Sequence, residues 1–162
     1  GVNLMCRLTT RFPHWRGAGR VERSGLSGTE FSVLMATYGR DDAAHLEQAL
    51  ESLTRQSLAA SEVVLVEDGP IGAAARAVIE RYRAALNIQS VVMPRNVGLA
   101  AALNAGLQHC RHELVFRFDS DDMALPERFA RQVAAFAAGP VVDVVGSFAQ
   151  EMDSAGAPGK IR

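Results

Sequence analysis

Three carboxylates follow an apolar run in the stretch Phe116–Asp122, which reads FRFDSDD. Ligands bind at the carboxyl ends of the strands in an α/β sheet, so carboxylates at such a strand end indicate binding rather than surface decoration. Asp119 and Asp121 are one residue apart, and their oxygens can converge on one hard cation. This spacing favours Mg²⁺ or Mn²⁺ held by two carboxylates and by substrate phosphates. Asp121 or Asp122 could instead cap the helix that Pro126 helps to start.

Three further apolar runs also end in polar residues. Thr37 and Tyr38 close the first, Asp68 closes the second, and Arg95 and Asn96 follow the third. Tyr38 could lie against the ring of a nucleotide base, and Asp68 could accept hydrogen bonds from a base or ribose. Arg95 could bind a phosphate or a base carbonyl, because its guanidinium is always charged and multidentate. Beside a bound cation, this set suits a nucleotide diphosphate, whose developing charge the cation would neutralise.

The alternation of apolar runs and amphipathic stretches predicts which elements carry these residues. Short β-branched runs are typical of buried parallel strands, and apolar residues spaced by three and four positions are typical of helices. Their regular alternation predicts an α/β fold, a three-layer sandwich with a mostly parallel sheet. The expected strands cover 31–38, 62–68, 88–93, 114–118 and 141–148. Asp41 or Asp42 can cap the first expected helix, in which Leu46, Leu50 and Leu53 share one face, and the other expected helices cover 73–86, 98–111 and 129–136.

Composition limits the class of protein. With 162 residues, 48% of them hydrophobic, the chain can form one domain with a sizeable core. The formal net charge of -1 gives no electrostatic reason to expect a nucleic-acid partner. Cys6 and Cys110 are far apart and indicate neither a zinc site nor a disulfide framework, so a reduced cytoplasmic protein is expected. No apolar stretch approaches the roughly 20 residues that span a bilayer, so membrane association would need segments outside this sequence.

The two ends of the sequence lack the periodicity of its central part. Residues 1–29 carry arginines among Gly, Ser and Thr, and we expect a flexible leader or a cloning remnant, with a basic arm at a membrane surface as the alternative. Residues 30–152 form the expected domain. The tail from Glu151 to Arg162 contains Ser, Gly and Pro and is expected to be loop, in which 153–162 lead to a missing acceptor-side segment.

Four short motifs occur along the chain: VLMATY at 33–38, VLVEDGP at 64–70, PRNVGL at 94–99 with NAG at 104–106, and FDSDD at 118–122 with Pro126. Together they resemble the family 2 glycosyltransferases, which have the GT-A fold, with a Rossmann-like nucleotide-binding half. Each motif alone is weak, but their order and spacing from about Phe31 to Met152 carry the resemblance. It implies transfer of a sugar from a nucleotide-diphosphate sugar, usually with inversion at the anomeric carbon and helped by Mn²⁺ or Mg²⁺.

Roles of single residues follow from motif position. The resemblance places Thr37 and Tyr38 beside the nucleotide base, with Asp68 as the hydrogen-bond partner of that base. In the DxD pair, Asp119 would lie nearer the ribose and sugar, and Asp121 would bind the metal directly. The donor-binding candidates are therefore Thr37, Tyr38, Asp68, Arg95, Asn96, Gly98, Asn104 and Asp119, and the metal ligands are Asp121 and Asp119.

Several of these residues also have structural explanations. Asn96 and Gly98 could simply turn the strand into the following helix. Asn104 is polar within an apolar helical stripe, where a structural hydrogen bond explains it as well as a donor contact does. Arg117, inside the predicted fourth strand, needs a partner for its charge, because an unpaired buried charge is costly.

Two departures from the family pattern bear on function. Ala36 stands where the first strand commonly has Pro, which should change little. No residue after Phe148 is a convincing general base, since Glu151 and Asp153 lie in the predicted loop. We therefore expect the donor-binding portion of a longer enzyme whose general base lies outside this sequence.

The residues of these motifs are similar to those of enzymes that build bacterial surface polysaccharides. This implies a UDP-sugar donor, a saccharide or lipid-linked saccharide acceptor, and work in the cytoplasm at the inner face of the membrane. Apolar surface left exposed by the missing segment could drive homo-oligomer formation. The alternative is a catalytically silent nucleotide-binding module. An aspartyl phosphatase is disfavoured because its nucleophilic Asp lies on the opening strand, whereas this pair follows the fourth.

Overall fold

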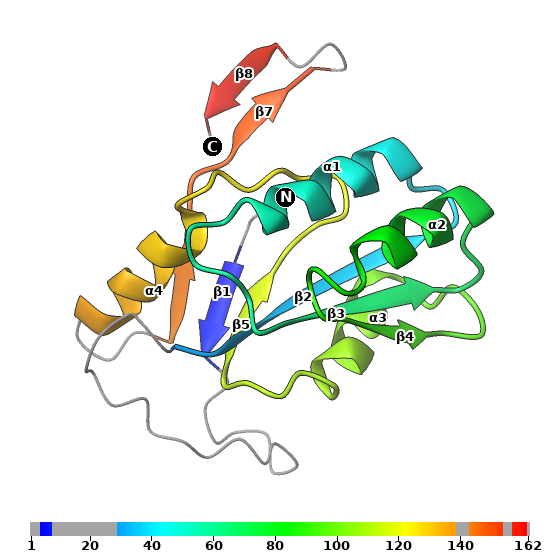
Figure 1. The fold of residues 1–162 in the computed structure, drawn as a ribbon, viewed down its shortest axis with the longest axis horizontal. Coiled ribbons are helices and arrows are strands. Elements are labelled where there is room, and N and C mark those ends of the chain that lie inside the picture. The colour runs from blue at the N-terminus through cyan, green and yellow to red at the C-terminus, as the bar shows by residue number, and fades with distance from the viewer. Residues whose placement is uncertain (1–3, 8–28, 139–142, 154–156, 162) are drawn as a thin grey trace.

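The computed structural model describes residues 4–7, 29–138, 143–153 and 157–161 (Figure 1). Its main sheet has six strands in the order β4-β3-β2-β5-β1-β6. The predicted mostly parallel sheet is confirmed, because the four neighbours β4, β3, β2 and β5 all run parallel. These strands are β2 (Phe31–Tyr38), β3 (Glu62–Asp68), β4 (Ile88–Val92) and β5 (Leu114–Arg117).

Helices cover both faces of the sheet, as a three-layer sandwich requires (Figure 1). On one face pack α1 (Ala43–Thr54), α2 (Ala73–Tyr82) and α4 (Arg128–Ala138), and on the other packs α3 (Leu99–Leu107). Both α2 and α3 end earlier than predicted. After α3, the amides of residues 108–110 bond to carbonyls three residues back, so the chain continues in tight turns instead of an α-helix.

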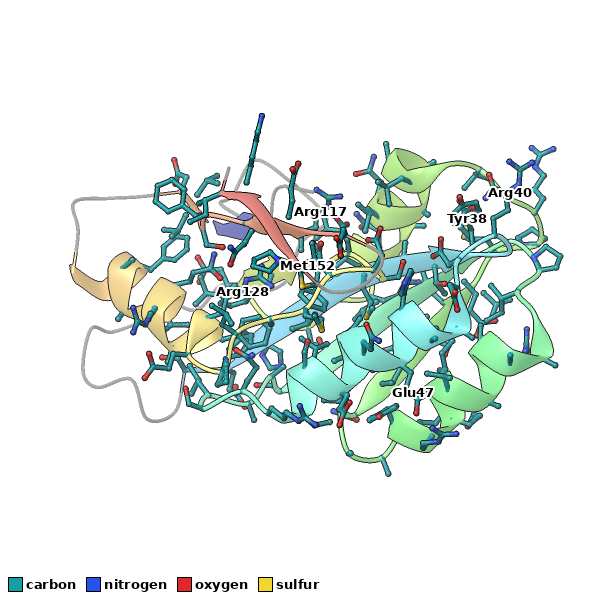
Figure 2. The ribbon with its side chains drawn as sticks, turned by 90° about the horizontal axis from the view of Figure 1, so that it is seen from above. Tyr38, Arg40, Glu47, Arg117, Arg128 and Met152 are labelled. Atoms are coloured by element: carbon teal, nitrogen blue, oxygen red, sulfur yellow. The ribbon has the colours of Figure 1, made fainter. Side chains whose placement is uncertain are left out.

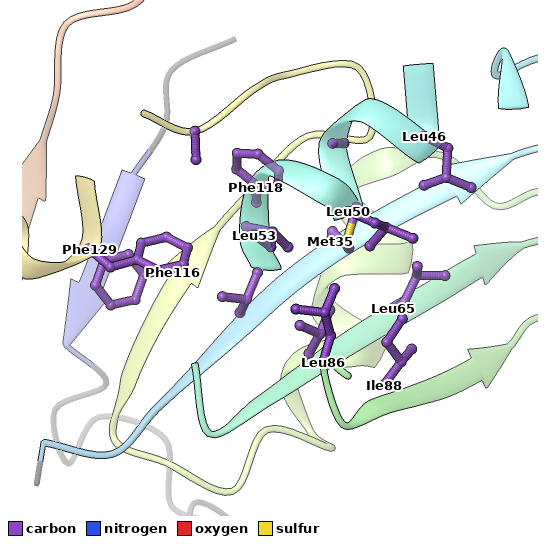
Figure 3. Packing of buried hydrophobic residues seen from close by; sticks show 14 of the residues in the cluster. Met35, Leu46, Leu50, Leu53, Leu65, Leu86, Ile88, Phe116, Phe118 and Phe129 are labelled. Atoms are coloured by element: carbon purple, nitrogen blue, oxygen red, sulfur yellow. The ribbon is translucent and has the colours of Figure 1, made fainter. Parts of the chain in front are cut away.

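Alternate strand residues supply the two cores. Met35 of β2 packs in the cluster beneath α1, and its neighbour Leu34 packs in the cluster beneath α3. The larger cluster includes the rings of Phe116, Phe118 and Phe129 (Figure 3). The rings of Phe31, Phe116 and Phe129 contact one another, with centroids 4.6 to 5.3 Å apart. Packing on both faces holds β2, β3 and β5 side by side, so the segments that follow them meet at one end of the sheet.

The beginning of the chain corrects one prediction. Within the region expected to be a leader, Leu4–Arg7 forms β1, which pairs antiparallel with β5 and with β6 (Val144–Gly146). The expectation of an unstructured leader is wrong for these residues because strand pairing uses backbone groups and needs no side-chain periodicity. Of the last predicted strand, 141–148, only the middle is β6, and residues 141–142 lie outside the described residues.

The end of the chain corrects a second prediction. The tail expected to be loop contains β7 (Gln150–Met152) and β8 (Pro158–Ile161), which pair as an antiparallel hairpin. The Gly and Pro residues that suggested a loop lie between these strands and at the start of β8. Figure 1 shows this hairpin at the end of the molecule where β6 leads out of the sheet. No helix in the described part of the chain is long and apolar enough to cross a bilayer.

Candidate functional site

The first part of the site lies where β2 and β3 end. Their parallel register pairs Thr37 with Glu67 and Tyr38 with Asp68, so both strands end at the same level. Thr37 is buried, whereas Tyr38, the last residue of β2, is 42% exposed (Figure 2). An exposed ring at a strand end is available to a flat ligand.

Asp68 fastens the loop after β4 to the end of β3. Its two carboxylate oxygens accept hydrogen bonds from the amides of Val97 and Gly98, at 2.7 and 3.0 Å. In return, the Asn96 side chain donates to the Asp68 carbonyl at 3.2 Å. Asp68 is 4% exposed. In the structure its carboxylate holds this loop against the end of β3.

Glycine is required beside Asp68. Gly69 has φ of 85°, and a Cβ atom there would lie 2.6 Å from the Asn96 amide nitrogen. The close approach brings the loop after β4 against the end of β3. Arg95 and Asn96 are exposed on this loop. The structure thus brings Tyr38, Asp68 and Arg95 together at the carboxyl end of the sheet, as predicted.

Asn104 does not lie in the apolar stripe of α3, because it is exposed. Its placement within the apolar stripe is therefore wrong, and both the structural hydrogen bond and the donor contact stay predictions. Gly98 is the residue before α3 and has φ of 88°, which supports its role in turning the chain into the helix.

The second part of the site is the segment after β5. Arg117 donates to Asp119 at 2.6 Å, and both side chains are partly exposed. This pair supplies the partner expected for the Arg117 charge. Asp121 is exposed. Neither Asp121 nor Asp122 caps the next helix, since α4 begins only at Arg128.

Behind this segment lies a poorly solvated group of charges. Burial raises the pKa of Asp122, and the negative charge of Asp119 raises it further. Burial also lowers the pKa of Arg128 to about 10. The Arg128 guanidinium lies 5.2 Å from the Phe118 ring and donates to the Arg117 carbonyl at 3.3 Å.

Some polar atoms of this group lack partners. Among the residues that the structure describes, none hydrogen-bonds Asp122 Oδ2, Arg128 Nε or Arg128 Nη1. The same holds for both polar side-chain atoms of the buried Gln132, one helical turn after Arg128. Unsatisfied buried polar groups are uncommon in folded proteins, and they concentrate here behind the acidic segment.

A residue absent from the predicted site joins its two parts. Asp41 Oδ2 accepts hydrogen bonds from Thr37 Oγ1 at 3.0 Å, the Tyr38 amide at 3.2 Å and Ser120 Oγ at 2.8 Å. The sequence offered Asp41 or Asp42 as the cap of α1, and Asp42 is the cap, with its carboxylate 2.8 Å from the Ala44 amide. Because one Asp is enough to cap the helix, the second Asp was the signal in the sequence that Asp41 could have another role.

The carboxylates at the carboxyl end of the sheet are the candidate ligands for a divalent cation. No group of three or more His, Cys, Asp or Glu side chains arranged to hold a metal occurs in the part of the chain that is described. Mg²⁺ needs only one or two carboxylates when substrate phosphates and water complete its coordination. Asp121 and the second oxygen of Asp119 offer such carboxylates, so the residues fit the predicted ion.

Comparison with known proteins identifies the family. Residues 32–159 match the model of glycosyl transferase family 2. The chain belongs to this family. The resemblance predicted from the sequence is therefore confirmed at the level of the family.

Curated relatives extend this finding. The chain is 44% identical over 126 residues to the amylovoran biosynthesis glycosyltransferase AmsE of Erwinia amylovora, covering 78% of this chain and 47% of that protein. It is 43% identical over 100 residues to the UDP-Gal:alpha-D-GlcNAc-diphosphoundecaprenol beta-1,3-galactosyltransferase of Escherichia coli, covering 62% of this chain and 36% of that enzyme. The chain thus spans less than half the length of these family 2 relatives.

Solved structures confirm the GT-A fold. The structure of S. aureus TarS 1–349 in complex with UDP matches with a TM-score of 0.59 and 28% identity, covering 67% of this chain and 32% of that one. The mannosyltransferase PcManGT of Pyrobaculum calidifontis matches with a TM-score of 0.62 at 22% identity, covering 79% of this chain and 36% of that one. At that lower identity, the second likeness concerns the fold alone.

Proposed function

We propose that residues 30–152 form the donor-binding part of a glycosyltransferase in surface polysaccharide synthesis. The reaction transfers a sugar from a UDP-sugar to a saccharide or lipid-linked saccharide acceptor, with inversion and with help from Mn²⁺ or Mg²⁺. It takes place in the cytoplasm, at the inner face of the membrane. One observation carries the proposal. Asp68 fastens the loop after β4 to the end of β3, and Asp41 fastens the segment after β5 to the end of β2, so polar side chains gather at the carboxyl end of the sheet.

The nucleoside half of the donor binds at the ends of β2 and β3. Tyr38 offers its exposed ring to the base, and Thr37 fixes the backbone beneath it through its bond to Asp41. Asp68 accepts from the base or ribose with lone pairs left after its two backbone hydrogen bonds. Arg95 reaches the base or the phosphates from the loop that Asp68 holds.

The diphosphate half binds at the segment after β5. Asp121 and Asp119 would hold the cation, which would supply Lewis-acid assistance to the departing diphosphate. Arg117 keeps Asp119 in place through their ion pair and reduces the repulsion between neighbouring carboxylates. The general base that activates the acceptor hydroxyl is not assigned to any residue of this sequence.

Two comparisons support the choice of donor and acceptor. TarS, at 28% identity, was solved in complex with UDP, and the E. coli relative uses UDP-Gal with a diphosphoundecaprenol-linked acceptor, according to their names. AmsE is named for the synthesis of a polysaccharide, amylovoran. These relatives make UDP the first nucleotide to try and a lipid-linked saccharide the first acceptor.

Calorimetric titration of the purified protein tests the proposal. UDP, GDP and dTDP are each titrated with Mn²⁺ and with a chelator, and uridine serves as the control that lacks phosphate. We expect UDP to bind, to bind more tightly with Mn²⁺ than with chelator, and to bind more tightly than GDP or dTDP. Absence of binding for all three nucleotides, in this chain and in a longer one, would contradict the donor site.

A second measurement separates the enzyme from a silent binding module. A longer protein that contains this chain is supplied with a UDP-sugar and a lipid-linked saccharide, and release of UDP is followed. Turnover supports the glycosyltransferase. Nucleotide binding without turnover would favour the silent module instead.

A further inference from the structure

Asp41 occupies a junction between the two halves of the candidate site. One of its oxygens, Oδ2, accepts three hydrogen bonds, two from the end of β2 and one from the segment after β5. The donor from the segment after β5 is the hydroxyl of Ser120, which lies between Asp119 and Asp121 and is 8% exposed. The donors from β2 are the Thr37 hydroxyl and the Tyr38 amide. A single carboxylate oxygen therefore contacts both halves.

The neighbouring carboxylate shows that Asp41 is not needed to begin the helix. Asp42 caps α1 through the Ala44 amide, so the helix terminus is already served. Asp41 is partly buried, and it spans 79 positions of sequence to reach Ser120. Charge-assisted hydrogen bonds of this kind are shorter and stronger than neutral ones. The bond from Ser120 thus restrains the segment that contains both predicted metal ligands.

We propose that Asp41 is a positioning residue that couples nucleoside binding at the end of β2 to the order of residues 119–122. A base that contacts Tyr38 fixes the backbone amide that Asp41 binds, and Asp41 in turn fixes Ser120. Order at Ser120 keeps Asp119 and Asp121 at a constant separation. This inference rests on the proposed donor site and adds a residue that the family motifs do not include.

Substitutions in the protein test the coupling. Asp41→Ala removes all three bonds, Ser120→Ala removes only the link between the halves, and Asp42→Ala is the matched control that removes an adjacent carboxylate. The affinity for UDP is measured with Mn²⁺ and with chelator, and the ratio of the two is the readout. We expect the ratio to fall about tenfold in the first two variants, as for loss of one charge-assisted hydrogen bond, and to stay unchanged in Asp42→Ala.

A double variant shows whether one bond is responsible. Because Asp41→Ala and Ser120→Ala break the same bond, the double variant should lower the ratio no further than either single one. Asp41→Asn keeps an acceptor oxygen without the charge and should recover part of the ratio. An unchanged ratio in Asp41→Ala, additive losses in the double variant, or no recovery in Asp41→Asn would overturn the inference.

Hydrogen exchange provides a readout that needs no metal. Amides of residues 119–122 should exchange faster in Asp41→Ala and Ser120→Ala than in the wild type and in Asp42→Ala, and added UDP should slow them only when Asp41 is present. If the wild type binds no UDP, the proposed function fails. The exchange rates without ligand then decide the structural link, and equal rates in all variants would overturn it too.

Discussion

The two ends of the sheet each contain a carboxylate shared between elements, but they differ in what surrounds it. At the amino end, Glu62 of β3 accepts hydrogen bonds from Ser32 of β2 at 2.6 Å and from the Arg111 amide and Nε at 2.7 and 2.6 Å. Burial opposes its ionisation, but these hydrogen bonds and the Arg111 charge outweigh burial and hold the pKa of Glu62 below its ordinary value of 4.5.

The carboxyl end is satisfied less completely. Asp41 has three partners there, but Asp121 is exposed, and Asp122 Oδ2 and Arg128 Nε have no partner among the described residues. A closed network such as that of Glu62 stabilises one arrangement of the chain. At the carboxyl end, the exposed Asp121 carboxylate remains accessible to a ligand. The comparison therefore predicts that the amino end serves stability and the carboxyl end binding.

The largest expected effect is at the carboxyl end. Asp121→Ala should remove the gain in UDP affinity that Mn²⁺ provides, a loss of at least about tenfold, because a direct carboxylate ligand disappears. The midpoint of thermal unfolding should hardly change, since Asp121 is exposed. Calorimetry with and without chelator measures the UDP affinity, and a thermal scan measures the midpoint of unfolding. Asp143→Ala, an exposed Asp just before β6, is the control, and a persistent Mn²⁺ effect in Asp121→Ala would remove this residue from the site.

The amino end should behave in the opposite way. Glu62→Gln should lower the free energy of unfolding by about 2 kcal/mol, because charge-assisted hydrogen bonds to a buried group are lost. Binding of UDP should stay the same. Urea denaturation measures the first effect. The control is Glu47→Gln, which breaks the exposed pair with Arg81 and should cost about 1 kcal/mol or less. A weaker UDP affinity in Glu62→Gln would break the division between the two ends.

A smaller effect should appear in the dependence on pH. The depressed pKa of Glu62 means that the unfolded chain takes up a proton near pH 4.5 before the folded one does. The stabilisation is present in full above the unfolded pKa and is lost as the pH falls through the folded one. The difference in unfolding free energy between wild type and Glu62→Gln should therefore shrink as the pH falls below 4.5. A constant difference over this range would show that hydrogen-bond geometry, not charge, sets the effect.

The sequence by itself determined the central strands and indicated the chemistry. Apolar runs with β-branched residues predicted 31–38 and 62–68, and the structure has strands over the same residues. The spacing of Asp119 and Asp121 after a strand indicated a cation and a diphosphate. Both features depend on neighbours within a few positions, where side-chain periodicity and carboxylate spacing are visible directly.

Contacts between distant segments were decided only by the tertiary structure. The bond from Ser120 to Asp41 spans 79 positions, and the bond from Val97 to Asp68 spans 29. The pairing of β1 between β5 and β6 joins residues still farther apart in the sequence, and it uses backbone groups that every residue possesses. Periodicity describes which face of an element is apolar, but it does not say which polar side chain another loop will meet. That choice depends on how the packed sheet and helices bring the loops together.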